Sequence, residues 1–196
     1  MRELYTQNAR ADIGSSIEVN KVLRNTYMLL ALTLAFSAVT AGIAMAINMS
    51  HGMGLIMIGA SLGPIVNHYL AMSNGGSIVL QALGGTAVIF LGLSGYTLTT
   101  RKDFSFLRGF VAVGLMVMIA CMLLLIGASL FGFDVSALSL AFSAGIVLLM
   151  SALILFQTSA IIHGGETNYI MATTSLYLSI INLFTSLLHL LGASNE

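Results

Sequence analysis

The stretch ILFQTSAIIHGGETNYIMATTSLYLSIINLF, residues 154–184, places a short polar turn between two apolar runs. His163-Gly164-Gly165-Glu166 interrupts the apolar sequence, and two adjacent glycines are typical of a turn. Glu166 stands near the start of the second run, where a carboxylate interacts favourably with the helix dipole. The pattern predicts two helices joined by a polar turn that contains His163, Glu166 and Asn168. A proton relay through His163 and Glu166 is the alternative interpretation.

The composition requires lipid as the solvent for most of this chain. Of its 196 residues, 58% are hydrophobic and 7% are charged, and the mean hydropathy is +0.99. A soluble domain carries about 25% charged residues, so we predict an all-α polytopic membrane protein. The net charge is zero, and no basic patch indicates nucleic-acid binding. The single cysteine, Cys121, excludes an intrachain disulfide and a cysteine metal cluster.

Six apolar segments are candidates for membrane spans. They are residues 26–47, 53–72, 77–99, 106–131, 137–162 and 171–191. Ahead of them, Ser15 and Glu18 have the S-x-x-E spacing of a capping box, which predicts that a helix begins there. We therefore expect an N-terminal tail and helix start over 1–24, a transmembrane bundle over 25–192 and a short C-terminal tail over 193–196.

The basic residues predict the topology. Loop lysines and arginines prefer the cytoplasm, and here they form two clusters. The clusters are Arg2, Arg10, Lys21 and Arg24 near the N-terminus, and Arg101, Lys102 and Arg108 after the third segment. If both clusters are cytoplasmic, an even number of crossings separates them, and one of the three intervening segments does not cross. Segment 53–72 contains Pro64, Asn67 and His68, which suit a re-entrant element shielded by protein. The C-terminus then lies outside the cytoplasm.

One face of the last apolar segment is polar. At 100° per residue, five side chains fall within about 80° of one another. They are Ser175, Ser179, Asn182, Ser186 and His189. Lipid cannot form hydrogen bonds with such a stripe, so we expect it to face protein or water. The two interpretations are contact between helices and the lining of an ion or proton path.

Gly92-Leu93-Ser94-Gly95 has the form G-x-S-G, which is similar to a motif of rhomboid-type intramembrane serine proteases, with His189 as the imagined base. That chemistry needs the serine at the mouth of a helix with the histidine in reach. Ser94 instead precedes the basic loop at residue 101, and a small-residue packing patch explains it better. We assign no catalytic, cofactor-binding or metal-ligating residue.

Three stretches carry a resemblance to a known family. They are KVLRNTYMLLALTLAFSAVTA (21–41), ALGGTAVIFLGLSGYTLTTRKDFSFL (82–107) and LFQTSAIIHGGETNYIMATTSLYLSIINLFTSLLHLLG (155–192). The chain resembles the Bax inhibitor-1 (transmembrane BAX inhibitor motif) family over nearly its whole length. The resemblance implies a bundle of seven helices, six of them around the C-terminal one. About one span, roughly 20 residues, is missing here between the first span and residue 76.

The resemblance implies two functions. Some family members resemble pH-sensitive calcium leak channels latched by two aspartates, and the matching positions here are Gln157 and Ser179. Neither side chain ionises, so the gating by a proton shared between two aspartates does not apply to this chain. A cation or proton leak along the polar stripe remains an alternative.

A bacterial inner-membrane branch of the family implies the other function. It is non-enzymatic modulation of FtsH, the membrane-anchored ATP-dependent protease, together with its HflK/HflC complex. In that interpretation the polar N-terminal tail is a handle, meaning the exposed end on which the protease pulls. The surrounding partner is membrane lipid, and no cofactor is expected. An ordinary disordered terminus is the alternative interpretation of the tail.

Overall fold

The computed structural model describes residues 2–46 and 62–194, which form six α-helices and no strand. The helices are α1 (Arg2–Ala46), α3 (Leu62–Leu70), α4 (Gly75–Thr100), α5 (Leu107–Leu130), α6 (Ser136–Ile162) and α7 (Tyr169–Ala193). All but α3 are long and apolar enough to cross a membrane, which confirms the prediction of a polytopic helical membrane protein. Residues 53–61 of the predicted second segment, and residues 1, 195 and 196 of the predicted tails, lie outside the described residues.

The described part of the second segment is mostly α3, which has nine residues. A helix of that length rises about 14 Å, which is half the thickness of the bilayer core, so α3 alone does not cross. Pro64 lies in its first turn, where a missing N–H costs no helical hydrogen bond. A tight turn over residues 71–74 then leads into α4, and Gly75 packs so closely on the end of α3 that a Cβ would meet the backbone of Tyr69 and Leu70.

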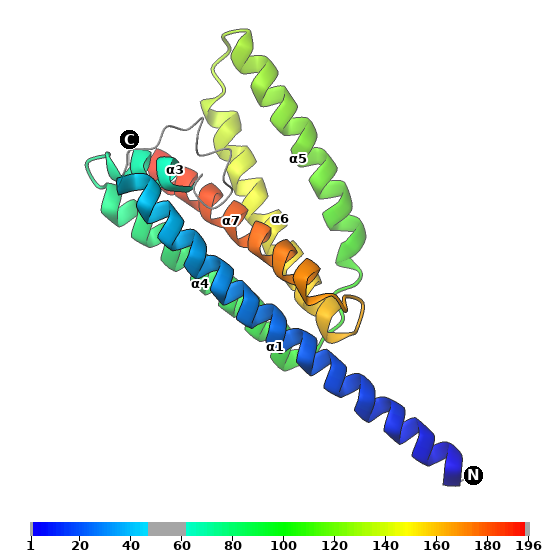
Figure 1. Cartoon of the computed structure of the whole chain (residues 1–196). Coiled ribbons are helices and arrows are strands. Elements are labelled where there is room, and N and C mark those ends of the chain that lie inside the picture. Colours follow the sequence, from blue (N-terminus) through cyan, green and yellow to red (C-terminus); the bar gives the residue numbers. More distant parts are fainter. Residues whose placement is uncertain (1, 47–61, 195–196) are drawn as a thin grey trace.

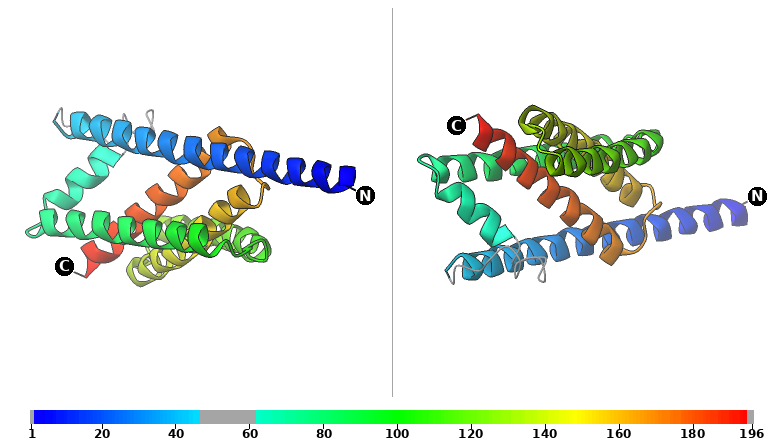
Figure 2. Two further views of the ribbon diagram at one scale, coloured as in Figure 1. Left: turned by 90° about the horizontal axis from the view of Figure 1, so that it is seen from below. Right: turned by 90° about the horizontal axis from the view of Figure 1, so that it is seen from above.

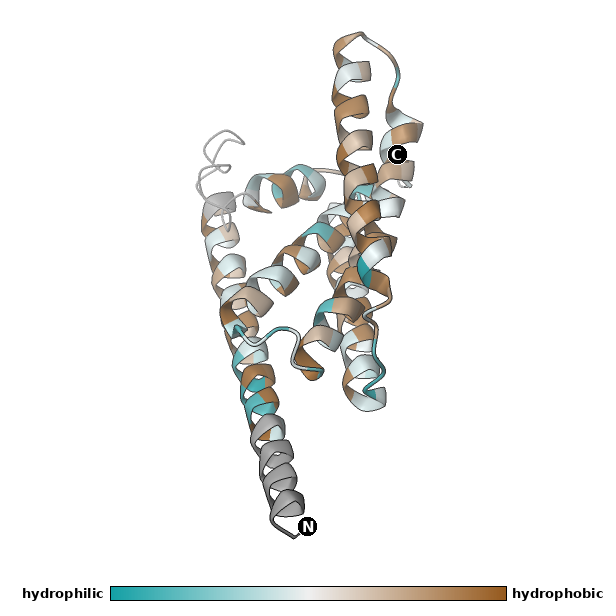
Figure 3. Cartoon of the chain, turned by 90° about the vertical axis from the view of Figure 1, so that its right-hand side faces the viewer, coloured by the Kyte–Doolittle hydropathy of each residue, from teal (hydrophilic) through white to brown (hydrophobic). Residues whose placement is uncertain are grey.

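The order of the helices places the two basic clusters at one end of the molecule. α1 and α4 run in opposite directions, α5 and α6 form the next antiparallel pair, and α7 returns toward the end that α4 starts from (Figure 1). Loops 101–106 and 163–168 therefore lie at the end from which α1 projects, and the C-terminus lies at the other end (Figure 1). This arrangement is the one that the charge pattern predicts. Hydrophilic residues gather on the turns of α1 next to its grey N-terminal part and in the loops, whereas the helices are mainly hydrophobic (Figure 3).

The C-terminal helix α7 is the centre of the bundle. It crosses diagonally between α1 and α4 (Figure 2). Leu176 joins a core cluster with Leu30 of α1, Leu188 joins one with Ala82 of α4, and Leu183 packs with buried residues of α6. In the most apolar part of α7, 44% of the residues are buried, compared with 6% in α5, which diverges from the other helices (Figure 1). The central C-terminal helix agrees with the fold that the resemblance implies.

The predicted start of the first helix is wrong. The S-x-x-E pattern at Ser15 and Glu18 predicts a helix start, but α1 is continuous from Arg2. Residues 2–12 are rich in arginine, glutamate, leucine, glutamine and alanine, all of which have high helix propensity. Serine is only neutral to mildly unfavourable inside a helix, and α1 continues through the capping pattern.

Candidate functional site

A polar pair joins α6 and α7 inside the bundle. Ser179 is 1% exposed, and its hydroxyl donates to Oε1 of Gln157 at 3.2 Å. The same hydroxyl lies 2.9 Å from the carbonyl oxygen of Ser175, one turn earlier in α7. The structure thus brings together the two positions that the resemblance assigns to the family's acidic pair. Because neither side chain ionises, the interface holds a neutral hydrogen bond where two aspartates would share a proton.

Two further hydroxyl contacts tie the helices together at other depths. The hydroxyls of Ser94 in α4 and Thr158 in α6 lie 3.5 Å apart. Nearer the C-terminal end of α7, Nδ1 of His189 lies 2.9 Å from Oγ of Ser143 in α6. Ser94 lies in the last two turns of α4 and His189 in the last two turns of α7, and these two helices end at opposite ends of the bundle (Figure 1). The two side chains also have different partners. The structure therefore does not bring together the serine and histidine of the rhomboid-like interpretation.

The polar stripe of α7 divides between the interior and the surface. Ser179 and Ser186 are buried, and Ser175 and His189 are half-buried. Asn182 differs from the expected inward stripe because it is exposed, and its Nδ2 donates to the carbonyl oxygen of Leu178 in the same helix at 2.9 Å. The helical period identified residues that share a face, but burial along that face is not uniform: Ser179 and His189 each meet a side chain of α6, whereas Asn182 is exposed.

The turn between α6 and α7 uses its polar side chains for local structure. Asn168 is the N-cap of α7, and its Oδ1 accepts from the backbone N–H of Ile170 at 3.0 Å. Glu166 accepts from the backbone N–H of Asn168 at 2.8 Å. Nδ1 of His163 donates to the carbonyl oxygen of Ser159 at 3.0 Å. These contacts are those of a turn with a helix cap, and His163 and Glu166 form no hydrogen bond with each other among the contacts of the described residues.

Loop 101–106 is fastened to the end of α6 beside this turn. The backbone N–H of Phe104 donates to Oγ of Ser159 at 2.9 Å. Within the loop, the backbone N–H of Ser105 donates to Asp103 at 2.8 Å. That backbone hydrogen bond, the Ser105 hydroxyl and the charge of His163 hold the pKa of Asp103 below its usual value, although desolvation acts in the opposite direction. Ser159 thus connects the two loops at this end of the bundle.

Sequence reasoning missed several polar contacts. It did not identify Ser143, which meets His189, or Thr158, which meets Ser94. It also did not identify the hydrogen bond of 2.6 Å between Ser37 of α1 and Tyr177 of α7. The sequence could have indicated these residues, because a polar side chain inside a membrane span is expected to have a hydrogen-bond partner. Which partner each one finds depends on how the helices pack.

Comparison with known proteins identifies the family. The family model described as "Inhibitor of apoptosis-promoting Bax1" matches residues 52–196. The chain is 44% identical to the Escherichia coli K12 protein named "Modulator of FtsH protease YccA", over 94% of this chain and 95% of that protein. It is 48% identical to an uncharacterized protein of Pseudomonas aeruginosa, over 92% of both chains, and 41% identical to a membrane protein of Vibrio cholerae, over 95% of both.

The same comparisons show an internal difference in length. The match to the Pseudomonas protein runs over 210 positions, whereas 92% of this chain is about 180 residues. About 30 positions of that relative therefore have no counterpart here, and the match to YccA gives nearly the same difference. A span takes about 20 residues, so the difference is large enough for one span. With the matching family model, the high identity over nearly the whole length and the central C-terminal helix, this chain belongs to the Bax inhibitor-1 family of multi-pass membrane proteins.

Proposed function

We propose that this chain is a non-enzymatic protein of the bacterial inner membrane that binds FtsH and slows or occupies it, in association with HflK/HflC. The observation that carries the proposal is the 44% identity, over nearly the full length of both chains, to a protein named as a modulator of that protease. The similarity extends over 94% of this chain rather than over one motif, which supports a function of the whole bundle.

The shape of α1 supports a role for the N-terminus as the handle. α1 extends beyond the bundle at the end where loops 101–106 and 163–168 lie (Figure 1). The first residues of a domain are poorly ordered unless packing holds them, so we expect the projecting part of α1 to unfold more readily than the bundle. In this proposal residues 1–24 are engaged by the protease, and residues 25–192 resist extraction because the core is built around α7.

Co-purification and turnover test this proposal. The full chain and a variant lacking residues 2–14 are each produced with FtsH in membranes, and association, degradation of the chain and degradation of a second FtsH substrate are measured. We expect both chains to co-purify with FtsH, and the shortened chain to be degraded more slowly. A matched control replaces residues 2–14 with a Gly/Ser linker of equal length. Equal turnover of all three chains contradicts the handle, and no co-purification with FtsH contradicts the proposed function.

The orientation in the membrane is part of the proposal. We propose that the N-terminus and loop 101–106 are cytoplasmic, because both basic clusters lie at that end (Figure 1). Reporter fusions after Asn74 and after Glu196 are then expected to be active only as periplasmic reporters. A cytoplasmic signal at the C-terminus contradicts this orientation.

A cation or proton leak is the second candidate, because polar contacts occur at two depths of the α6–α7 interface. These contacts are Gln157 with Ser179, and Ser143 with His189. Ion flux into proteoliposomes of the purified chain tests this candidate, with Gln157→Leu as the variant. Flux that requires Gln157 supports a path along α6 and α7. The absence of flux, or flux that is indifferent to Gln157→Leu, removes the leak.

A further inference from the structure

A basic pocket lies at the end of the bundle that carries loops 101–106 and 163–168. Its walls come from α1, from the end of α4 and from the end of α6, which meet where α1 leaves the bundle (Figure 1). The pocket has a volume of about 410 Å³. Its ionisable lining residues are Arg101 and His163, and none of the described residues that line it is acidic. The lining therefore does not neutralise the charge of the arginine.

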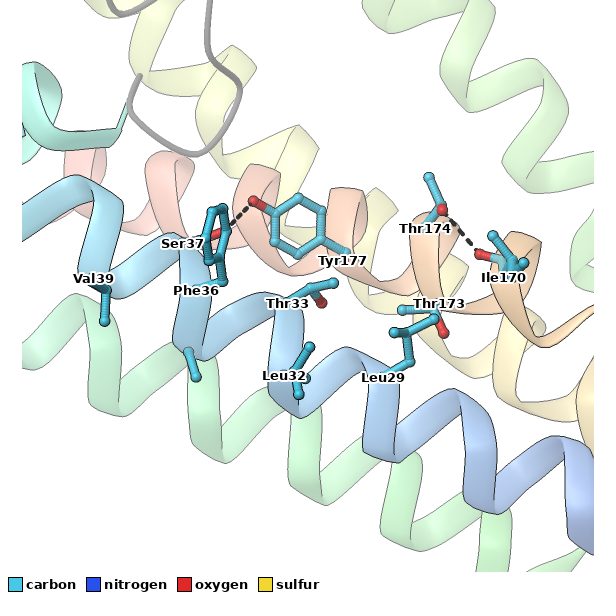
Figure 4. A pocket seen from close by; sticks show the side chains of 11 residues that line it. Leu29, Leu32, Thr33, Phe36, Ser37, Val39, Ile170, Thr173, Thr174 and Tyr177 are labelled. Atoms are coloured by element: carbon cyan, nitrogen blue, oxygen red, sulfur yellow. Dashed lines mark hydrogen bonds between the residues drawn. The ribbon is translucent and has the colours of Figure 1, made fainter.

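The groove between α1 and α7 differs from this basic pocket. It is larger, about 810 Å³, but the described residues that line it are uncharged and mainly apolar (Figure 4). Its polar groups have partners, because the hydroxyls of Ser37 and Tyr177 lie 2.6 Å apart and Thr174 donates to the carbonyl oxygen of Ile170 at 2.9 Å. That groove does not distinguish one ligand from the surrounding lipid chains, whereas a charged pocket does.

The walls of the basic pocket change from apolar to polar in all three helices. Leu23, Leu98 and Ile162 are half-buried, and each lies on the membrane side of a polar lining residue of its own element. The candidate spans of α4 and α6 end directly before Arg101 and His163. The pocket thus lies where the hydrocarbon of a bilayer gives way to the lipid headgroups, and basic side chains at this depth reach lipid phosphates.

The side chain of Arg101 is available for a ligand. Within residues 16–46 and 62–194 its guanidinium forms no ion pair or hydrogen bond, and its backbone N–H donates to the carbonyl oxygen of Thr97 at 2.9 Å. In contrast, Nζ of Lys102 lies 3.4 Å from the hydroxyl of Tyr96 and 5.9 Å from the centre of its ring. Arg101 also has φ +48°, a conformation that helix ends usually assign to glycine. An arginine in that conformation is a reason to expect a function for its side chain.

The carboxylates at this end of the bundle lie outside the basic pocket. Glu18 and Glu166 line a neighbouring pocket that shares only Val19 and Gly164 with the basic one. Asp103, in the adjoining loop, accepts from the backbone N–H and the hydroxyl of the residue two positions later. These nearby negative charges disfavour a ligand with several phosphates, so a ligand with one phosphate fits the pocket better.

We propose that the basic pocket binds the headgroup of one anionic phospholipid with a single phosphate, of the phosphatidylglycerol type. Basic pockets between spanning helices bind such headgroups. The guanidinium of Arg101 pairs with the phosphate. Asn20 supplies a further donor, and so does His163 in its charged form, through Nε2, because its Nδ1 contacts the carbonyl oxygen of Ser159 at 3.0 Å. The acyl chains begin at the apolar floor. A soluble phosphate has no apolar part to cover that floor, so the lipid is the expected ligand.

Native mass spectrometry of the full chain tests this site. The chain is placed in nanodiscs with equal amounts of phosphatidylglycerol and phosphatidylcholine, and the lipids retained after its release are counted. We expect one phosphatidylglycerol per chain, in preference to phosphatidylcholine. Arg101→Gln is expected to lower this preference about fivefold, the factor that one basic side chain near a membrane surface contributes. Arg108→Gln is the matched control, because Arg108 is also exposed but does not line the pocket, and it should leave the preference unchanged.

A second pair of substitutions tests the shape of the pocket without removing a charge. Asn20→Trp fills the pocket and is expected to abolish retention of phosphatidylglycerol. Ile17→Trp is its control, because Ile17 lies on the same helix, is 63% exposed and does not line the pocket. Both Asn20 and Arg101 are exposed, so neither substitution disturbs the core.

Three results overturn the proposal. The first is equal retention of the two lipids by the unaltered chain. The second is an equal loss of preference in Arg101→Gln and Arg108→Gln, since general surface charge then explains the binding. The third is retention of phosphatidylglycerol by Asn20→Trp at the level of Ile17→Trp. Excess inorganic phosphate distinguishes the two sources of the ligand: we expect it to leave the lipid bound, and complete displacement of the lipid by phosphate contradicts a lipid site.

Discussion

The hydrogen bond between Ser179 and Gln157 allows the α6–α7 interface to be tested by a double-mutant cycle. Interhelical hydrogen bonds in membranes contribute about 0.6 kcal/mol on average and about 1.7 kcal/mol at most. Ser179 has a single hydroxyl hydrogen, and the carbonyl oxygen of Ser175 is nearer at 2.9 Å than Oε1 of Gln157 at 3.2 Å. Sharing that hydrogen weakens the bond to Gln157, so we expect a coupling energy near the average, about 0.6 kcal/mol, rather than near the maximum.

The cycle uses Ser179→Ala, Gln157→Leu and the double variant, with unfolding measured by reversible denaturation in mixed micelles. Thr185→Ala replaces Ser179→Ala in the control cycle. Among the described residues, the Thr185 hydroxyl donates only within its own helix, to the carbonyl oxygens of Ile181 and Asn182. We expect no coupling between Thr185 and Gln157. Purely additive losses in the Ser179 cycle refute the reasoning, since they show that the observed contact contributes no free energy to the interface.

Three further predictions concern the end of the bundle where the two loops meet. Asn168→Ala removes the N-cap of α7 and is expected to lower the free energy of unfolding by about 1 kcal/mol, whereas Asn168→Asp keeps the cap, as the same unfolding assay measures. Gly164 has φ +72°, so Gly164→Ala is expected to lower the free energy of unfolding by about 1–2 kcal/mol. Gly165→Ala is expected to lower it less, because φ is not positive there and a Cβ meets only ordinary contacts. Equal losses of unfolding free energy contradict the role of backbone conformation. Asp103 has a folded-state pKa below 3.8, so its contribution is present above pH 3.8 and is lost as the pH falls through the folded-state value. Stability of the unaltered chain should therefore fall more steeply in acid than that of Asp103→Asn, and parallel pH profiles contradict this assignment.

The sequence alone determined the class of protein, most spans and the position of the polar turn. These features depend on local composition, because a stretch of about 20 apolar residues is stable across a bilayer whatever its neighbours are. The predicted segments 77–99, 106–131, 137–162 and 171–191 agree with α4–α7 to within two residues at each end. The positions of the basic residues also predicted that loop 101–106 lies at the same end as the basic part of α1.

Only the tertiary structure decided which polar side chains meet. The helical period places Ser179 and Asn182 on one face of α7, yet Ser179 is buried against Gln157 and Asn182 is exposed. Periodicity defines a face of one helix, whereas the helix that covers this face is set by packing between segments far apart in the chain. Likewise, the sequence shows that His189 is a polar residue within a span, whereas its contact with Ser143 depends on how α6 packs on α7.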